Sequence, residues 1–451
     1  MRREVVITGV GAISALGVGL YPAWEAMVAG RSGLGQVSRV DCRAFRAGLG
    51  GEVKEFTARD HVPKSYRKAT KVMARDIELA VVAAKFAVED AGLVTRIHAE
   101  TGQTQTTYAS EVTGCHIGAG LIAAETLELT TALVTAVKDG AFSLREWGTI
   151  DDGAGAPAGG MNNLQPLWML KYLPNMLACH VTILHGAEGA SNTITCGESS
   201  GLLSLGESRR VIERGSCDVC FSGGAESKLS LLGLLRSQLA GRLADTTGIS
   251  EAWHAVRPFD PAGTGTLVGE GGGILILEEA EVAAQRRARI YARFIGFGAA
   301  QSIAPGLPPM AAPAEQVNRG LVLAIRAALA DAKLQPTDID AVFPQGSGIA
   351  ALDAAELGAL REVFGMRLES IPLCSITPFV GDLAAGHGGF QTGVAAISLR
   401  EQKLPARLHV GTPAIKGAAA APSTPAALRH VLVCCSSLAG QNAAAILSRA
   451  E

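Results

Sequence analysis

The sequence predicts a layered α/β fold whose sheets are largely buried, and three observations support this. Short runs rich in Val, Ile and Leu alternate with alanine-rich runs of helical periodicity. Apolar residues make up 48% of the 451 residues and charged residues only 18%, so much of the chain must be buried. The 54 glycines suit tight turns and close packing of helices on sheets. Helices are expected at Asp76–Asp90, Leu202–Glu213, Ala314–Ala332 and Gln391–Arg400.

Buried strands are expected at the N-terminus and in two later apolar runs. The first starts at Val5 and runs into a glycine turn. Further apolar runs cover Cys217–Gly224 and Gly273–Leu277. Continuous apolar runs of this kind are typical of strands that are covered on both faces.

Three segments are expected to be loops or caps rather than core. They are Asp151–Asn163, Gln301–Pro313 and Gly411–Pro425. The last is an alanine- and proline-rich stretch of low complexity, which is typical of a mobile segment.

A segment near the middle of the chain carries the first functional signal. It reads GASNTITCGESSGLLSLGE from Gly189 to Glu207 and predicts a strand that turns sharply into a helix. This segment resembles the nucleophile region of β-ketoacyl synthases. Other motifs resemble that family in the same order: VVITGVGAISALG at 5–17, CDVCFSGGAE at 217–226, RPFD and GEG at 257–271, and LAGQN at 438–442. Several independent motifs in the right order are far more specific than any one of them.

The resemblance implies a thiolase-like, five-layered α-β-α-β-α fold of two pseudo-repeated halves. We place the N-terminal half at 1–285 and the C-terminal half at 286–451, with cap and dimer insertions at about 95–190. Within those insertions, Leu167–Thr195 resembles the family's dimer interface segment. Its aromatic and methionine content would fit an ordinary core equally well, because large apolar side chains alone do not mark a site.

The resemblance also shows which groups are missing. Counted from both flanks, Glu198 occupies the position of the family's reactive cysteine. Two further positions, both catalytic histidines in the family, hold Gln345 and Asp382. Thr377 stands where the family has a lysine. These four residues are the expected pseudo-active site.

These replacements remove the chemistry of condensation. In the family, the cysteine thiolate takes up an acyl group, and the histidines bind a malonyl thioester and assist its decarboxylation. Gln345 can donate a hydrogen bond but cannot exchange a proton near neutral pH. An anionic Asp382 would oppose the negative charge that develops. Glu198 suits a helix N-terminus as a structural replacement, worth about 0.3–1 kcal/mol. We therefore expect no catalytic residue in this chain.

Two nearby residues are candidates to replace the missing nucleophile and histidine. Cys196 lies two residues before Glu198 and, on a continuing strand, would line the same cavity. The flanking matches allow no shift of the nucleophile, so core filling is the default interpretation, with a reactive thiol as the alternative. His387 forms a second Gly-His pair, but the spacing to the next strand favours Gly388 as the last glycine of the motif. A position on a helix face is therefore expected for His387.

The C-terminal glycine loop is the expected gate. Leu438 stands where the family usually has a gating phenylalanine, and Gly440 follows in the same loop. With Cys196, these residues are the expected tunnel or gate positions.

The Cys217-x-x-Cys220 pair alone would suggest a metal or redox site. Both cysteines lie in a predicted buried strand, and no second pair of ligands is spaced to complete a zinc site. Cys434 and Cys435 are adjacent in another apolar strand. Structural packing is expected for all four, with no metal and no cofactor.

Composition excludes several classes of partner. A net charge of −2 argues against nucleic acid and against an anionic membrane surface. Nine cysteines at irregular spacing do not form a secreted disulfide framework. The N-terminus lacks the pattern of a signal peptide, and no apolar run reaches the roughly 18–20 residues of a membrane span. A cytoplasmic protein is expected.

Within the family, the lost triad most resembles chain length factors, the β subunits of type II polyketide ketosynthases, including those of aryl-polyene-like pathways. This implies a heterodimer with a catalytic ketosynthase, a shared acyl tunnel and an acyl carrier protein as partner. Glutamine is common at their cysteine position, so Glu198 departs from the usual residue. Two alternatives stay open. One is a decarboxylase that makes starter units from malonyl carrier protein, although such enzymes keep their histidines. The other is a homodimeric acyl-binding scaffold.

Overall fold

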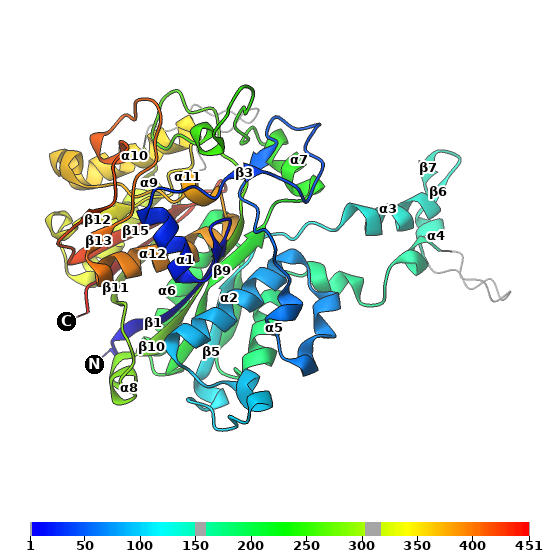
Figure 1. Ribbon diagram of the computed structural model, residues 1–451, viewed down its shortest axis with the longest axis horizontal. Coiled ribbons are helices and arrows are strands. Elements are labelled where there is room, and N and C mark those ends of the chain that lie inside the picture. Colours follow the sequence, from blue (N-terminus) through cyan, green and yellow to red (C-terminus); the bar gives the residue numbers. More distant parts are fainter. Residues whose placement is uncertain (1, 149–158, 303–316, 451) are drawn as a thin grey trace.

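A computed structural model describes residues 2–148, 159–302 and 317–450. In these ranges, one large mixed sheet has the order β12-β15-β16-β11-β1-β10-β9-β5-β8, with β2 beside β1 (Figure 1). Strand β5 runs parallel to β8 and β9, and β12 runs parallel to β15. The strands of this sheet are β1 (Val5–Ser14), β2 (Gly17–Val18), β5 (Thr113–Gly118), β8 (Ser191–Ile194), β9 (Val219–Ser227), β10 (Glu270–Glu279), β11 (Ala292–Gln301), β12 (Ala341–Phe343), β15 (His430–Ser436) and β16 (Gln441–Ser448).

Helices cover the sheet in layers. Helices α2 and α5 pack on strands of the N-terminal half, α9 and α10 pack on strands of the C-terminal half, and α6 and α12 lie between the halves. The part of the sheet made of β1, β10, β9, β5 and β8 and the part made of β11, β16, β15 and β12 form the two β layers, so the order is α-β-α-β-α, as the resemblance implies. The helices are α1 (Leu20–Val28), α2 (Arg75–Ala91), α3 (Thr126–Thr135), α4 (Leu144–Trp147), α5 (Met176–His185), α6 (Ser200–Glu213), α7 (Leu231–Leu239), α8 (Ala280–Gln285), α9 (Arg319–Ala332), α10 (Ala350–Phe364), α11 (Thr377–Val380) and α12 (His387–Glu401).

The two central helices approach each other as closely as their backbones allow. A Cβ atom on Gly388 would lie 2.6 Å from the backbone nitrogen of Leu202. A Cβ atom on Gly201 would lie 2.7 Å from the carbonyl oxygen of Ala385. Only glycine fits at these contacts. The crossing brings together the residues that precede α6 and α12, which include two of the expected pseudo-site positions.

Two predicted helices start elsewhere in the structure. The helix expected from Ala314 begins at Arg319, because the Asn318 side chain accepts a hydrogen bond from the Leu321 N–H at 3.1 Å and caps the helix there. Residues 314–316 lie outside the described part of the chain. The helix expected from Gln391 begins one turn earlier, at His387. Burial on all sides hides the amphipathic pattern that would mark this start.

The segment Gly411–Pro425 was predicted to be a loop or a cap, but part of it belongs to the core. Ile415 and Ala418 are buried in the core beneath α9 and α10. The Leu373 N–H donates to the carbonyl oxygen of Gly417 at 3.0 Å. Low sequence complexity misled the prediction here, because small residues can also pack closely against a core. The other two predicted loops lie partly outside the described residues.

An arm made of α3, α4 and the hairpin β6 (Val137–Lys138) to β7 (Ala141–Phe142) extends away from the body (Figure 1). Its apolar side chains are strongly exposed, among them Leu127 at 84% and Leu144 at 75%. Exposed apolar surface of this extent is typical of a protein interface.

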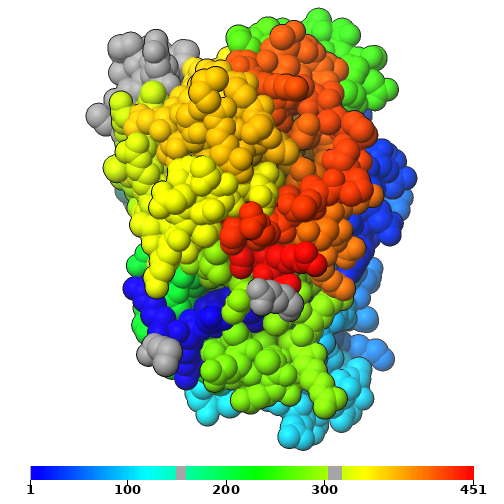
Figure 2. Space-filling view, turned by 90° about the vertical axis from the view of Figure 1, so that its left-hand side faces the viewer, coloured from blue at the N-terminus to red at the C-terminus, as the bar shows by residue number. Residues whose placement is uncertain are grey.

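The two ends of the chain lie on one face of the body. Figure 2 shows the last residues, in red, close to the light green segment at α8 that joins the two halves. Helix α8 ends at Gln285 and β11 begins at Ala292. Division of the chain at 285 and 286 stays a prediction. In the described residues, no helix has both the length and the apolar character needed to span a membrane.

Candidate functional site

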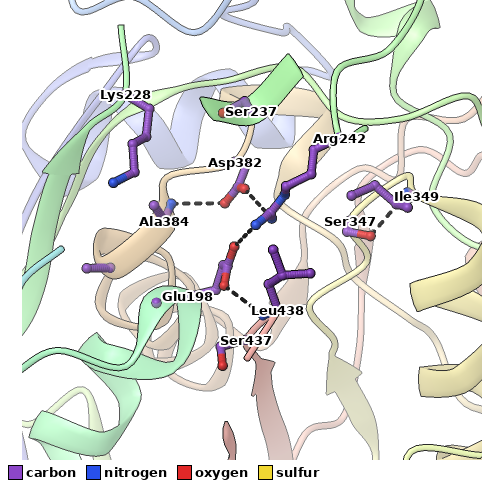
Figure 3. A network of polar contacts seen from close by, with 12 residues as sticks. Glu198, Lys228, Ser237, Arg242, Ser347, Ile349, Asp382, Ala384, Ser437 and Leu438 are labelled. Atoms are coloured by element: carbon purple, nitrogen blue, oxygen red, sulfur yellow. Dashed lines mark hydrogen bonds and ion pairs between the residues drawn. The ribbon is translucent and has the colours of Figure 1, made fainter. Parts of the chain in front are cut away.

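Two of the predicted pseudo-site residues meet at one edge of the sheet. Glu198 follows β8 in a short 3-10 turn, Gly197–Ser199, that leads into α6. Asp382 lies between α11 and α12. The two carboxylates face the same cation from opposite sides (Figure 3).

That cation is Arg242, which comes from the loop after α7. One of its Nη atoms lies 2.5 Å from Oε1 of Glu198, and the other lies 2.9 Å from Oδ2 of Asp382. The side chains of Arg242 and Asp382 are each 14% exposed, and that of Glu198 is 6% exposed. The planar guanidinium thus joins the buried carboxylate of Glu198 and the largely buried one of Asp382, a geometry that suits its fork of donors. We call these three residues the ion-pair bridge.

The Glu198 carboxylate also accepts a backbone hydrogen bond. The Leu438 N–H donates to Oε2 at 3.2 Å. In acyl-transfer enzymes, two N–H donors of this kind hold the carbonyl oxygen of the substrate. Here the Glu198 side chain takes up the Leu438 N–H.

The charges of the ion-pair bridge follow from its geometry. Burial alone would raise the pKa of Glu198, but Arg242 and the backbone donors outweigh burial and hold this pKa below its ordinary value. Burial raises the pKa of Asp382, and the nearby Glu198 charge adds to the increase, whereas Arg242 opposes it. Burial would lower the pKa of Arg242, but the two carboxylates raise it. Arg242 and Glu198 therefore form the charged core of the bridge.

Gln345 and Thr377 lie beside the bridge and contact each other. The Thr377 hydroxyl donates to the Gln345 carbonyl oxygen at 3.2 Å, and Thr377 is fully buried. The backbone N–H of Gln345 donates to Glu356 at 2.8 Å. The side-chain Oε1 of Gln345 is buried without a hydrogen-bond partner among the described residues. Neither residue offers a group that titrates near neutral pH.

Little space remains at this pseudo-site. Glu198, Arg242, Gln345 and Leu438 line a cavity of about 30 Å³. A volume of this size holds one or two water molecules, because a single water needs about 10–15 Å³ on this measure. An acyl thioester does not fit there in this conformation.

Of the predicted gate residues, Leu438 borders this cavity, whereas Gly440 and Cys196 are not among its lining residues. Leu438 lines the cavity and is half-buried. Gly440 has φ +88°, and a Cβ atom there would lie 2.1 Å from the carbonyl oxygen of Ser302. This turn therefore requires glycine. Its role is to hold the backbone that presents the Leu438 N–H to Glu198.

Cys196 does not line this cavity. Its N–H donates to the Ser200 hydroxyl at 2.8 Å, and the chain turns at Gly197, which has φ +56°. The alternation of a strand does not continue through this turn, so the expectation that Cys196 and Glu198 share a cavity fails. Burial raises the pKa of the Cys196 thiol, which disfavours its reactive thiolate form.

His387 is fully buried at the first residue of α12. Neither of its ring nitrogens has a hydrogen-bond partner among the described residues. Burial lowers its pKa to about 4, although the Glu198 charge acts in the opposite direction. The imidazole is therefore neutral at pH 7 and has no contact with the ion-pair bridge through a hydrogen bond.

The cysteines are all free thiols, and those of the Cys217 to Cys220 motif are fully buried. The neighbouring Cys220 thiol lowers the pKa of Cys217. In the described ranges, no group of three or more His, Cys, Asp or Glu side chains is placed to hold a metal ion.

The sequence did not reveal Arg242. Two buried carboxylates require a nearby cation, so the presence of a partner could have been expected. Its identity could not, because Arg242 is 44 residues from Glu198 and 140 residues from Asp382 along the chain.

Comparison with known proteins gives one family. Residues 2–283 match the β-ketoacyl synthase N-terminal domain, and residues 298–411 match the C-terminal domain of the same family. The chain is 28% identical over 412 residues to 3-oxoacyl-[acyl-carrier-protein] synthase 2 of Staphylococcus aureus (strain COL), covering 91% of this chain and 89% of that protein. It is 32% identical over 400 residues to the actinorhodin polyketide β-ketoacyl synthase 2 of Streptomyces coelicolor, covering 88% and 86%.

Solved structures agree with this result. The ishigamide ketosynthase/chain length factor superposes with a TM-score of 0.80 at 25% identity, and the match covers 100% of both chains. A type II polyketide ketosynthase in complex with its acyl carrier protein superposes with a TM-score of 0.80 at 22% identity, again over 100% of both chains. The fold expected from the sequence, thiolase-like and five-layered, is thereby confirmed.

Proposed function

Because this chain belongs to the β-ketoacyl synthase family, we propose that it is a non-condensing chain length factor that pairs with a catalytically intact ketosynthase and shapes its acyl tunnel. The ion-pair bridge is the observation that carries this proposal. By the motif spacing, its two carboxylates take the positions expected for the nucleophile and for one histidine, and Arg242 pairs with both.

The bridge cannot perform the condensation step. Acyl transfer needs a thiolate or a comparable nucleophile, and the Glu198 carboxylate is held by Arg242 and the Leu438 N–H. Decarboxylation of a malonyl thioester needs donors that stabilise the developing enolate. At this site the Leu438 N–H already donates to Glu198, and the carboxylates of the bridge would oppose the enolate charge. Decarboxylation is therefore a weaker candidate function than a supporting role.

The surface of the chain supports a partner. Strand β8 is the last strand of the sheet, and its first residues are exposed. Most of the large apolar side chains that are exposed among the described residues belong to the arm and to the segment leading into β8. The predicted interface, Leu167–Thr195, is continuous with this surface. We propose that the arm and this segment together form the interface with the ketosynthase, and that the tunnel passes beside it.

The relatives are consistent with this role. The matched structures include a ketosynthase/chain length factor and a ketosynthase bound to an acyl carrier protein. An acyl carrier protein is thus the second proposed partner. A homodimeric scaffold would use the same apolar surface, so the identity of the partner decides between the two functions.

The test of the proposal is an assay of the purified chain alone and with a ketosynthase from the same organism that retains its cysteine and two histidines. The chain alone should neither condense nor decarboxylate malonyl carrier protein, because the ion-pair bridge and Gln345 supply neither a thiol nucleophile nor an imidazole. Mass spectrometry of acyl adducts and malonyl consumption measure this. Glu198→Cys should also remain inactive, because Gln345 and Asp382 are unchanged. An acyl adduct on Cys196, or turnover above the buffer rate, would contradict the proposal.

Replacement of Glu198 should have a moderate effect on stability and little effect on the partner's chemistry. Glu198→Ala leaves the Leu438 N–H without its acceptor, which costs about 1–3 kcal/mol. Arg242 keeps Asp382 as its partner, so no uncompensated charge results. Glu198→Gln, which keeps an acceptor, is the matched control and should lose less. Chemical denaturation and product analysis of the complex measure both effects. Complete loss of condensation in an assembled complex would show that Glu198 has a role in the reaction.

A further inference from the structure

A second cavity, of about 220 Å³, lies at the opposite end of the strands from the ion-pair bridge. It adjoins Thr113 and Val219, which are the first residues of β5 and β9. Glu198 instead follows the carboxyl end of β8, which runs parallel to β5. The six residues of β5 span roughly 20 Å at about 3.3 Å per residue, so the two sites are separate.

The inner wall of this cavity is apolar and aromatic. Phe221 and Val219 of β9 and Leu93 after α2 contribute apolar side chains. The His185 ring lies 4.9 Å from the Phe221 ring at an interplanar angle of 34°. Both rings line the cavity. Such a pair favours a flat ligand ring, which can stack or meet the two rings edge-on.

The walls are fixed before any ligand arrives. Tyr108 lines the cavity, and its hydroxyl donates a hydrogen bond to the Glu278 carboxylate. Glu278 in turn forms an ion pair with Arg286 at 2.5 Å. His185 is held by Thr95, whose hydroxyl lies 2.9 Å from Nδ1. Burial lowers the pKa of His185 to about 3, so its ring is neutral. A preformed cavity of this kind binds without a large ordering cost.

The outer rim is polar and carries one cation. Arg96 lines the rim, and its side chain is 55% exposed. Its guanidinium donates to the Ile183 carbonyl oxygen at 3.3 Å and to Glu188 at 3.4 Å. Two of its five N–H groups are used in these contacts, and an exposed pair such as Arg96 with Glu188 is weak. Gln103, Thr104 and Ser110 add further polar groups around the opening.

We propose that this cavity binds a small aromatic carboxylate, with the ring against Phe221 and His185 and the carboxylate at Arg96. The volume sets the size of the ligand, because drug-sized ligands occupy cavities of about 300–1,000 Å³ and this one is smaller. One ring with a short substituent fits. The charge of Arg96 selects an anion over a neutral ring, since no other charged side chain lines the cavity within the described residues. This site does not depend on the proposed function.

The experiment uses 4-fluorobenzoate as the anionic probe and fluorobenzene as the neutral probe, each followed by fluorine NMR on the full chain. Saturable line broadening by 4-fluorobenzoate at millimolar concentration or below is expected, with weaker binding of fluorobenzene. Arg96→Met keeps the apolar stem but removes the charge, so it should weaken 4-fluorobenzoate about tenfold and leave fluorobenzene unchanged.

Two further variants complete the test. Ser110→Phe should fill the cavity and abolish binding of both probes. Arg43→Met removes an arginine that is 91% exposed and outside the cavity, and it should change nothing. Thermal unfolding confirms that each variant is folded. Absence of saturable binding, or unchanged binding in both Arg96→Met and Ser110→Phe, would overturn the proposal. If Ser110→Phe does not fold, the difference between the two probes in Arg96→Met decides alone.

Discussion

Replacement of Arg242 by methionine should be among the most destabilising single changes in this protein, at about 3–5 kcal/mol. Methionine keeps much of the volume of the side chain but removes the only cation of the ion-pair bridge. Glu198 and Asp382 then lose the cation that pairs with both, and the nearby Lys228 is already paired with Glu226. Chemical denaturation of the variant and the wild type at pH 8 measures the difference in the free energy of unfolding.

The sign of the pH dependence distinguishes this cause from a simple packing defect. Without Arg242, burial and mutual repulsion raise the pKa of both carboxyls above the unfolded values. The folded variant then binds more protons than the unfolded chain between about pH 4 and pH 8, so its stability falls as pH rises through that window. The loss caused by Arg242→Met should therefore be smaller at pH 5 than at pH 8. An equal loss at both pH values would point to packing.

A matched triple variant provides the control for charge. Glu198→Gln, Arg242→Met and Asp382→Asn together remove all three charges and keep the approximate shape. Neutral groups of similar volume often replace a buried ion pair with little loss. We expect this variant to recover most of the stability that Arg242→Met loses, with no dependence on pH from this site. A triple variant as unstable as Arg242→Met would show that the bridge contributes through geometry rather than charge.

The bridge marks the limit of what the sequence could reveal about the site. Glycines on both sides of Glu198 fixed its register, and Gly388 fixed that of Asp382, so these positions could be predicted by counting. The crossing of α6 and α12 then follows, since glycine is needed wherever the two backbones touch. Arg242 lies in a loop with no motif, and only tertiary packing determines which cation reaches the two carboxylates.

Element boundaries show the same limit. Helix α2 was predicted within one residue at each end because its apolar stripe is regular. The start of α12 was misplaced because thirteen of its residues, from His387 to Leu399, are buried and leave no amphipathic stripe. Cys196 was misplaced for a related reason, since one glycine with positive φ ended the alternation on which the prediction depended.

The arm was only partly predicted, because an isolated sequence cannot distinguish an interface helix from a core helix. The apolar residues of α3 have helical spacing, which also fits packing against the body. In the structure they face away from it, as the exposure of Leu127 and Val134 shows. An exposed apolar surface of this kind either binds a partner or lowers the solubility of the protein.

Two charges on the arm should therefore prevent assembly with the ketosynthase. Leu127→Asp and Leu144→Asp replace side chains that are 84% and 75% exposed in the free chain, so folding should be unaffected. In a complex, each aspartate would lose water without gaining a partner, and central apolar contacts of an interface commonly contribute about 2 kcal/mol or more. The double variant should bind about a thousandfold more weakly, since about 4 kcal/mol corresponds to three factors of ten.

Coexpression of each variant with the ketosynthase, followed by size-exclusion chromatography and product analysis, measures assembly and function together. Met366→Asp is the matched control, because Met366 is 87% exposed and lies in the 3-10 turn after α10, away from the arm. It should leave assembly unchanged. Loss of the complex and of product in the arm variant alone supports a heterodimer formed through the arm. If the arm variant still assembles, the interface lies elsewhere. If the wild-type chain remains a homodimer while the ketosynthase makes the same product without it, the scaffold function replaces the proposed one, because the chain then contributes nothing to the tunnel in which the product grows.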